Sequence, residues 1–107
     1  MKKMPRRLKV GAQIIEVVYP HVFKERNDAR GIASVLENKI YISKTGDEGT
    51  AYPWSRIEDT FLHEIMHVVS ELAVGNARLF DDENQHAAIC SLLLQVLKDN
   101  KLYFGDE

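Results

Sequence analysis

The sequence predicts an α+β fold, in which a sheet of three or four mostly antiparallel strands is followed by two packed helices. Short runs rich in Val and Ile, separated by turn residues, fill the first half of the chain and are typical of strands. Apolar residues at helical spacing fill the second half. Because all expected strands precede both expected helices, the helices should pack together on one sheet.

Two strands are expected first, over residues 8–10 (LKV) and 13–19 (QIIEVVY), with Gly11 in the turn between them and Pro20 after the second. A hairpin is expected next in IASVLENKIYIS, with its turn near residues 37–38. Strand side chains alternate between faces, so the two isoleucines of KIYIS should lie on one side and its tyrosine on the other.

A long helix is expected over residues 56–74. Ser55 and Glu58 have the spacing of a capping box, and Gly75 is a natural stop. Apolar residues recur along this segment at helical spacing, at Ile57, Phe61, Ile65, Val68 and Leu72.

Composition places the chain among ordinary globular proteins, with 45% apolar and 28% charged residues. We expect one domain over residues 1–107, with residues 1–7 flexible. The net charge of −2 suggests no nucleic-acid partner, although the basic residues gather near the N-terminus. A single cysteine, Cys90, excludes an internal disulfide. With no run of membrane-spanning length either, a cytoplasmic protein is expected.

The stretch TFLHEIMHVV carries the sharpest functional signal, because His63, Glu64 and His67 form a His-Glu-x-x-His motif. Residues four apart on a helix project from the same face, so both imidazoles can bind one Zn²⁺, at about 2.0–2.1 Å per bond. Glu64 is rotated by about 100° from His63, where it can act as a general base on water without being a ligand. A core helix with two hydrogen-bonded histidines is the alternative, and the complete motif favours zinc.

A catalytic zinc site needs a third protein ligand, and a second expected helix offers two. This helix is capped by Asp81 or Asp82 and ends near Asn100. Glu83 and His86 lie three apart in its first turns and share a face. We expect Glu83 to be the third metal ligand, with His86 as its competitor. His86 would then lie near the open coordination position as a catalytic residue that donates a hydrogen bond to a developing oxyanion.

The chain resembles the minimal zincin-like metallopeptidases of phages and other mobile elements, which are related to the ImmA/IrrE-type group. The resemblance rests on the order of four segments: KVGAQIIEVVY, GIASVLENKIYIS, TFLHEIMHVV and an acidic-capped helix ending LLLQVLKDN. It implies a zincin-like core, one zinc per chain, metal ligands at His63 and His67, and Glu64 as the catalytic glutamate. It also implies an acidic ligand at Glu83, although the surrounding stretch lacks the Glu-x-x-Ala-Asn pattern common in larger relatives.

The expected function is zinc-dependent hydrolysis of peptide bonds in a peptide or protein substrate, such as a repressor or a host factor. The KIYIS strand is expected either at the site edge, where it would bind an extended peptide, or as a plain core strand. Two other interpretations stay open. The chain would be a zinc-bound module that grips a partner without cutting it, or a metal-free interaction protein that uses its basic N-terminus.

Overall fold

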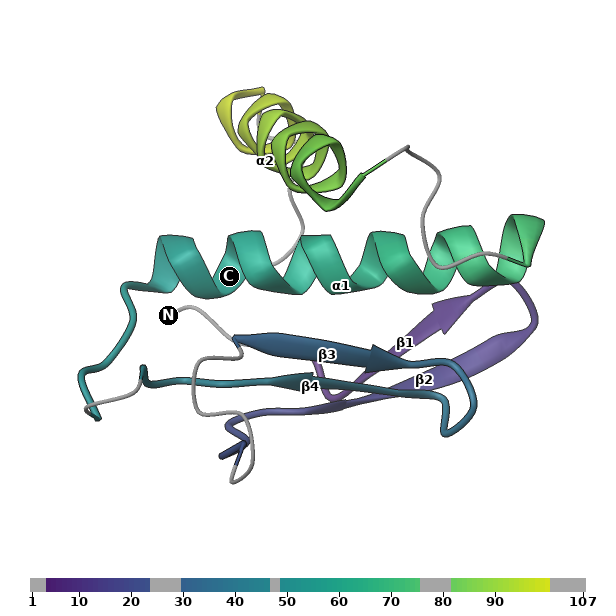
Figure 1. Cartoon of the computed structure of the whole chain (residues 1–107), viewed down its shortest axis with the longest axis horizontal. Coiled ribbons are helices and arrows are strands. Elements are labelled where there is room, and N and C mark those ends of the chain that lie inside the picture. Colours follow the sequence, from purple (N-terminus) through teal and green to yellow (C-terminus); the bar gives the residue numbers. More distant parts are fainter. Residues whose placement is uncertain (1–3, 24–29, 47–48, 76–81, 101–107) are drawn as a thin grey trace.

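The computed structural model describes residues 4–23, 30–46, 49–75 and 82–100. Within these residues, four strands precede two helices, which confirms the expected α+β class. The elements are β1 (Arg7–Val10), β2 (Gln13–Val18), β3 (Gly31–Ser34), β4 (Lys39–Ile42), α1 (Trp54–Val74) and α2 (Glu83–Asp99). Figure 1 shows three layers, with α1 lying along one face of the sheet and α2 crossing α1 on its far side.

The four strands form one mixed sheet in the order β1-β2-β4-β3. The pairs β1/β2 and β3/β4 are antiparallel, as expected, but β2 and β4 are parallel. The KIYIS segment forms β4. Because β4 pairs with β2 on one side and with β3 on the other, it cannot accept an added strand. The expectation that KIYIS lies at the site edge is wrong, because β3 occupies that edge.

The β3–β4 hairpin turns where the sequence predicts. Asn38 adopts a φ of 56°, a left-handed conformation that asparagine tolerates better than most residues. The backbone N–H of Asn38 donates to the backbone carbonyl oxygen of Val35 at 3.1 Å. The resulting register puts Ile40 and Ile42 fully inside the core, so the predicted alternation along this strand is confirmed.

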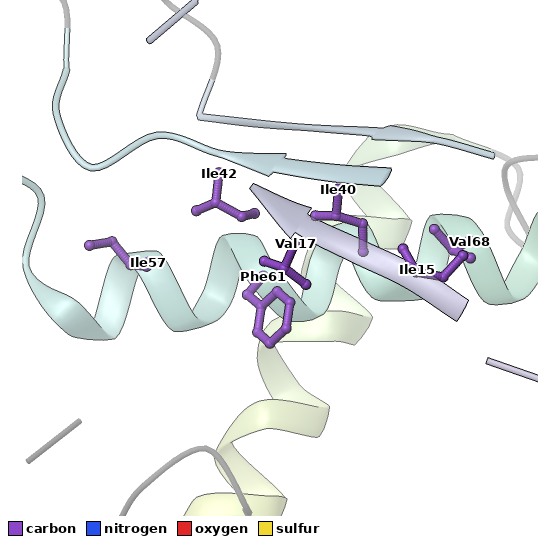
Figure 2. Packing of buried hydrophobic residues seen from close by; sticks show 7 residues of the cluster. All are labelled: Ile15, Val17, Ile40, Ile42, Ile57, Phe61 and Val68. Atoms are coloured by element: carbon purple, nitrogen blue, oxygen red, sulfur yellow. The ribbon is translucent and has the colours of Figure 1, made fainter. Parts of the chain in front are cut away.

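The core lies between α1 and the sheet (Figure 2). Branched side chains of two central strands meet one face of α1, and most of the helical series predicted from the sequence points there. Leu72, the last member of that series, is 40% exposed instead. The buried cluster consists of Ile15, Val17, Ile40, Ile42, Ile57, Phe61 and Val68.

The start of α1 differs from the expected capping box. The helix begins at Trp54 with Pro53 as its N-cap, and no side chain caps it. Glu58 does not reach back to the helix start. Its carboxylate is buried and accepts a hydrogen bond from Lys98 Nζ of α2 at 2.5 Å, because a buried carboxylate gains more from an ammonium partner than from a surface cap. The predicted end is confirmed, since Gly75 has a φ of 70° and donates to the Glu71 carbonyl at 2.9 Å.

Asp82 is the N-cap of α2, and its side-chain Oδ1 accepts a hydrogen bond from the backbone N–H of Gln85 at 2.7 Å. The alternative cap, Asp81, lies outside the described residues, as do residues 1–3 of the segment expected to be flexible. Asn100 is the C-cap, as predicted. Neither described helix is both long and apolar enough to traverse a lipid bilayer.

Candidate metal centre

The side chains of the His-Glu-x-x-His motif point to two different sides of α1. The His63 and His67 rings lie 4.8 Å apart on the side that meets α2, and both are mostly buried. Glu64, one position further along, lies on the side that meets β3. This is the arrangement that helical geometry predicts for neighbouring residues rotated by about 100°.

The carboxylate of Glu83 on α2 contacts both His63 and His67. A single oxygen, Glu83 Oε1, lies 2.5 Å from His63 Nε2 and 3.3 Å from His67 Nε2. Two donors bound to one tetrahedral zinc ion at about 2.05 Å lie roughly 3.3 Å apart. The distance to His67 matches that separation, whereas the distance to His63 is that of a direct hydrogen bond and would lengthen around an ion. The structure therefore brings the three ligands expected from the sequence to one point.

His86 lies beside these groups but deeper than expected. Its side chain is 1% exposed, and Nε2 lies 3.0 Å from the backbone carbonyl oxygen of His63, to which it donates. Its ring stacks on that of His67 with centroids 3.8 Å apart and planes 4° apart. An oxyanion forms on a substrate at the accessible side of a metal, so this buried, engaged nitrogen differs from the hydrogen-bond donor predicted at an open position.

The described residues offer a second candidate ligand triad beside the one with Glu83. The second consists of His63, His67 and His86, whose ring nitrogens lie within 4.8 Å of one another. An imidazole nitrogen binds metal through a lone pair in its ring plane. The parallel rings of His67 and His86 cannot both direct such lone pairs at one ion unless one ring rotates. The observed geometry therefore fits the triad with Glu83 better.

The charges at the site match what metal ligands need. Burial lowers the pKa of His63 below its ordinary value, and this outweighs the opposing effect of its hydrogen bond with Glu83. Desolvation alone would raise the pKa of Glu83, but the hydrogen bond from His63 and the charges of His67 and His63 hold that pKa below its ordinary value. A neutral imidazole and an ionised carboxylate are the forms that bind a metal, and the shifts of His63 and Glu83 favour these forms.

Glu64 is buried against the edge strand β3. A Cβ atom on Gly31 would lie 3.0 Å from Glu64 Cγ and 3.2 Å from Oε2, so the glycine makes room for this carboxylate. Burial raises the pKa of Glu64 to about 7, Glu83 adds to the rise, and the charge of His67 and a backbone hydrogen bond with Ala33 oppose it. A carboxylate with a pKa near neutrality can both accept and return a proton.

The contribution of β3 to the site was not predicted from the sequence. A glycine that opens a strand often marks a close approach of another segment, and Gly31 was such a signal. Asp59, one turn before His63 on α1, accepts a hydrogen bond from Ser91 of α2 at 2.7 Å. The remaining histidine, His21, contacts the ring of Tyr41 on the sheet.

Comparisons with protein families, curated proteins and solved structures found no match. The resemblance to zincin-like metallopeptidases therefore stays a prediction from the sequence. The case for a function is made by the geometry of His63, Glu64, His67 and Glu83.

Proposed function

We propose that the chain is a zinc-dependent peptidase. The observation that carries this proposal is the convergence of His63 and His67 of α1 on one carboxylate oxygen of Glu83 of α2. The motif supplies two of these groups from one rigid helix, and the third comes from a separate helix that packs on it. Such a set of two histidines and one glutamate is common in catalytic zinc sites.

Glu64 has the properties of the general base. His63, His67 and Glu83 would hold a zinc ion, which would supply a Lewis acid for a carbonyl group and make a proton of water easier to remove near neutral pH. The Glu64 carboxylate accepts that proton as the water oxygen adds to the scissile carbonyl carbon. Glu64 then donates the proton to the amine as the carbon–nitrogen bond breaks, which leaves a carboxylic acid and an amine.

The edge strand supports a peptide as substrate. Within the described residues, β3 pairs only with β4, so no other strand occupies its outer edge, where the Ala33 backbone hydrogen-bonds Glu64. Glu64 lies against Gly31 on this same strand. A peptide extended along β3 would therefore pass beside the proposed base. The substrate class is a peptide or protein, of which a repressor or a host factor is one kind.

The first experiment measures the metal content of protein purified without added metal or chelator. We expect about one zinc ion per chain in the wild type and a marked loss in His63→Ala and in Glu83→Ala. Glu64→Gln should retain zinc and lose cleavage of a mixed fluorogenic peptide library. A wild type that neither contains nor takes up zinc, although folded, would exclude the peptidase.

A zinc-bound interaction module is the second candidate. The outer face of α2 favours it, because four large apolar side chains are 37–64% exposed there: Ile89, Leu92, Leu93 and Val96. This candidate predicts zinc binding without cleavage of any library peptide. It also predicts that Glu64→Gln leaves capture of a partner unchanged, whereas the peptidase should hold substrates longer when Glu64 is replaced.

A further inference from the structure

We infer that His86 is a positioning residue, which sets how α2 docks on α1 so that Glu83 reaches the same point as the two motif histidines. The inference rests on the proposed metal centre. It assigns His86 neither to the ligands nor to the groups that touch substrate. Three observations carry it: a hydrogen bond between helices, a stacked pair of rings, and the burial of a polar side chain.

The hydrogen bond links α2 to the backbone of a metal ligand. His86 Nε2 donates to the carbonyl oxygen of His63 at 3.0 Å. A carbonyl oxygen has two lone pairs, so His63 can accept this bond in addition to the one within its helix. Glu83 lies one turn before His86 on the same face of α2. Fixing His86 along α1 therefore also fixes Glu83 relative to His63.

The stacked rings restrict the second motif histidine. The ring of His86 covers one face of His67, at 3.8 Å between centroids and 4° between planes. Rotation of His67 about its side-chain bonds would break this contact. The stack thus holds the orientation in which His67 Nε2 lies 3.3 Å from Glu83 Oε1. Zinc bond lengths tolerate deviations of about 0.2 Å, so small rotations matter.

The chemical nature of the buried group points the same way. The other buried residues on the inner side of α2, Cys90 and Leu94, pack as apolar groups. His86 is buried as deeply, at 1% exposure, although an imidazole is costly to bury without hydrogen bonds. An apolar side chain could fill this volume but would allow α2 to slide or turn on α1. The imidazole makes a directional hydrogen bond, which restricts how α2 can move on α1 and so fixes the position of Glu83.

The test measures zinc affinity by competition with a chromophoric chelator. His86→Phe keeps an aromatic ring and removes the donor, whereas His86→Gln has an amide nitrogen that can donate to the His63 carbonyl. Ser91→Ala is the matched control, because it removes another hydrogen bond between α2 and α1, to Asp59 at 2.7 Å, away from the three ligands.

We expect His86→Phe to weaken zinc binding by about 10- to 100-fold, the range seen when groups that orient metal ligands are removed. His86→Gln should recover part of this loss, and Ser91→Ala should change affinity by no more than about threefold. The Co²⁺ absorption of His86→Phe should keep the band intensity typical of the wild-type coordination number, because the number of coordinating atoms is unchanged, while displaced ligands shift the band positions.

Three results would overturn the inference about His86 and leave the proposed function intact. Wild-type affinity in His86→Phe would show that the ring and its bond are dispensable. An equal loss in Ser91→Ala would show a general effect of docking. A Co²⁺ band intensity in His86→Phe or His86→Gln that indicates a changed coordination number would make His86 a ligand. A folded wild type that binds neither Zn²⁺ nor Co²⁺ would instead refute the proposed function on which the inference rests. If His86→Phe fails to fold, the affinity and spectrum of His86→Gln decide.

Discussion

Replacing Glu64 by Gln in the metal-free protein should reduce the dependence of stability on pH. The pKa of Glu64 is about 7 in the folded chain, raised chiefly by burial from an ordinary value of 4.5. The folded state therefore holds this proton more tightly than the unfolded state. The stability due to Glu64 is complete below about pH 4.5 and is lost as the pH rises through about 7.

The size of the effect follows from these two pKa values. At about 1.4 kcal/mol for each pH unit between them, ionising the buried carboxyl costs roughly 3 kcal/mol of unfolding free energy. The charged groups that act on it, His67 and Glu83, are present in both proteins. Glutamine fills a similar volume and does not ionise, so the variant should lack this loss.

Urea unfolding followed by circular dichroism, with a chelator present, measures this difference at about pH 5 and about pH 8. The wild type should lose roughly 2–3 kcal/mol more than Glu64→Gln between these values. Glu16→Gln is the control, because it makes the same chemical change at an exposed carboxylate and should follow the wild type. Equal pH dependence in wild type and Glu64→Gln would refute the reasoning.

Three further substitutions test the packing that supports the site. Gly31→Ala places a Cβ 2.7 Å from Thr60 Cγ2, so denaturant unfolding should show a loss of about 1–3 kcal/mol; unchanged stability would mean that the helix and strand are further apart. Lys98→Met leaves the buried carboxylate of Glu58 without its ammonium, and calorimetry should show about 2–3 kcal/mol of destabilisation, partly recovered when Glu58→Gln is added. Ile40→Ala empties a fully buried position and should cost about 2–5 kcal/mol, read as a lower thermal midpoint; a loss below about 1 kcal/mol would contradict this core.

Local patterns in the sequence predicted much of the chain correctly. The 3.6-residue period puts His63 and His67 on one face of one helix wherever that helix lies, so their proximity needs no tertiary information. The same holds for the alternation along β4, for Asn38 in its turn and for Gly75 at the end of α1. These features depend on neighbours within a few residues, which the sequence shows directly.

These local patterns did not predict contacts between segments that are distant in the sequence. Strand periodicity does not state which strands are neighbours, so the parallel pairing of β2 with β4 and the edge position of β3 came only from the structure. The capping box at Glu58 failed because Lys98, forty positions away, provides a stronger partner for a buried carboxylate.

The sequence by itself determined the helix that carries His63, Glu64 and His67, because helical geometry depends on the local chain alone. Tertiary structure decided where Glu83 and His86 lie relative to the two motif histidines, which their shared face on α2 left open. The depth and register with which α2 packs on α1 bring Glu83 Oε1 between the two imidazoles and bury His86 against the His63 carbonyl. That register arises from contacts between two helices, and no periodicity within either helix encodes it.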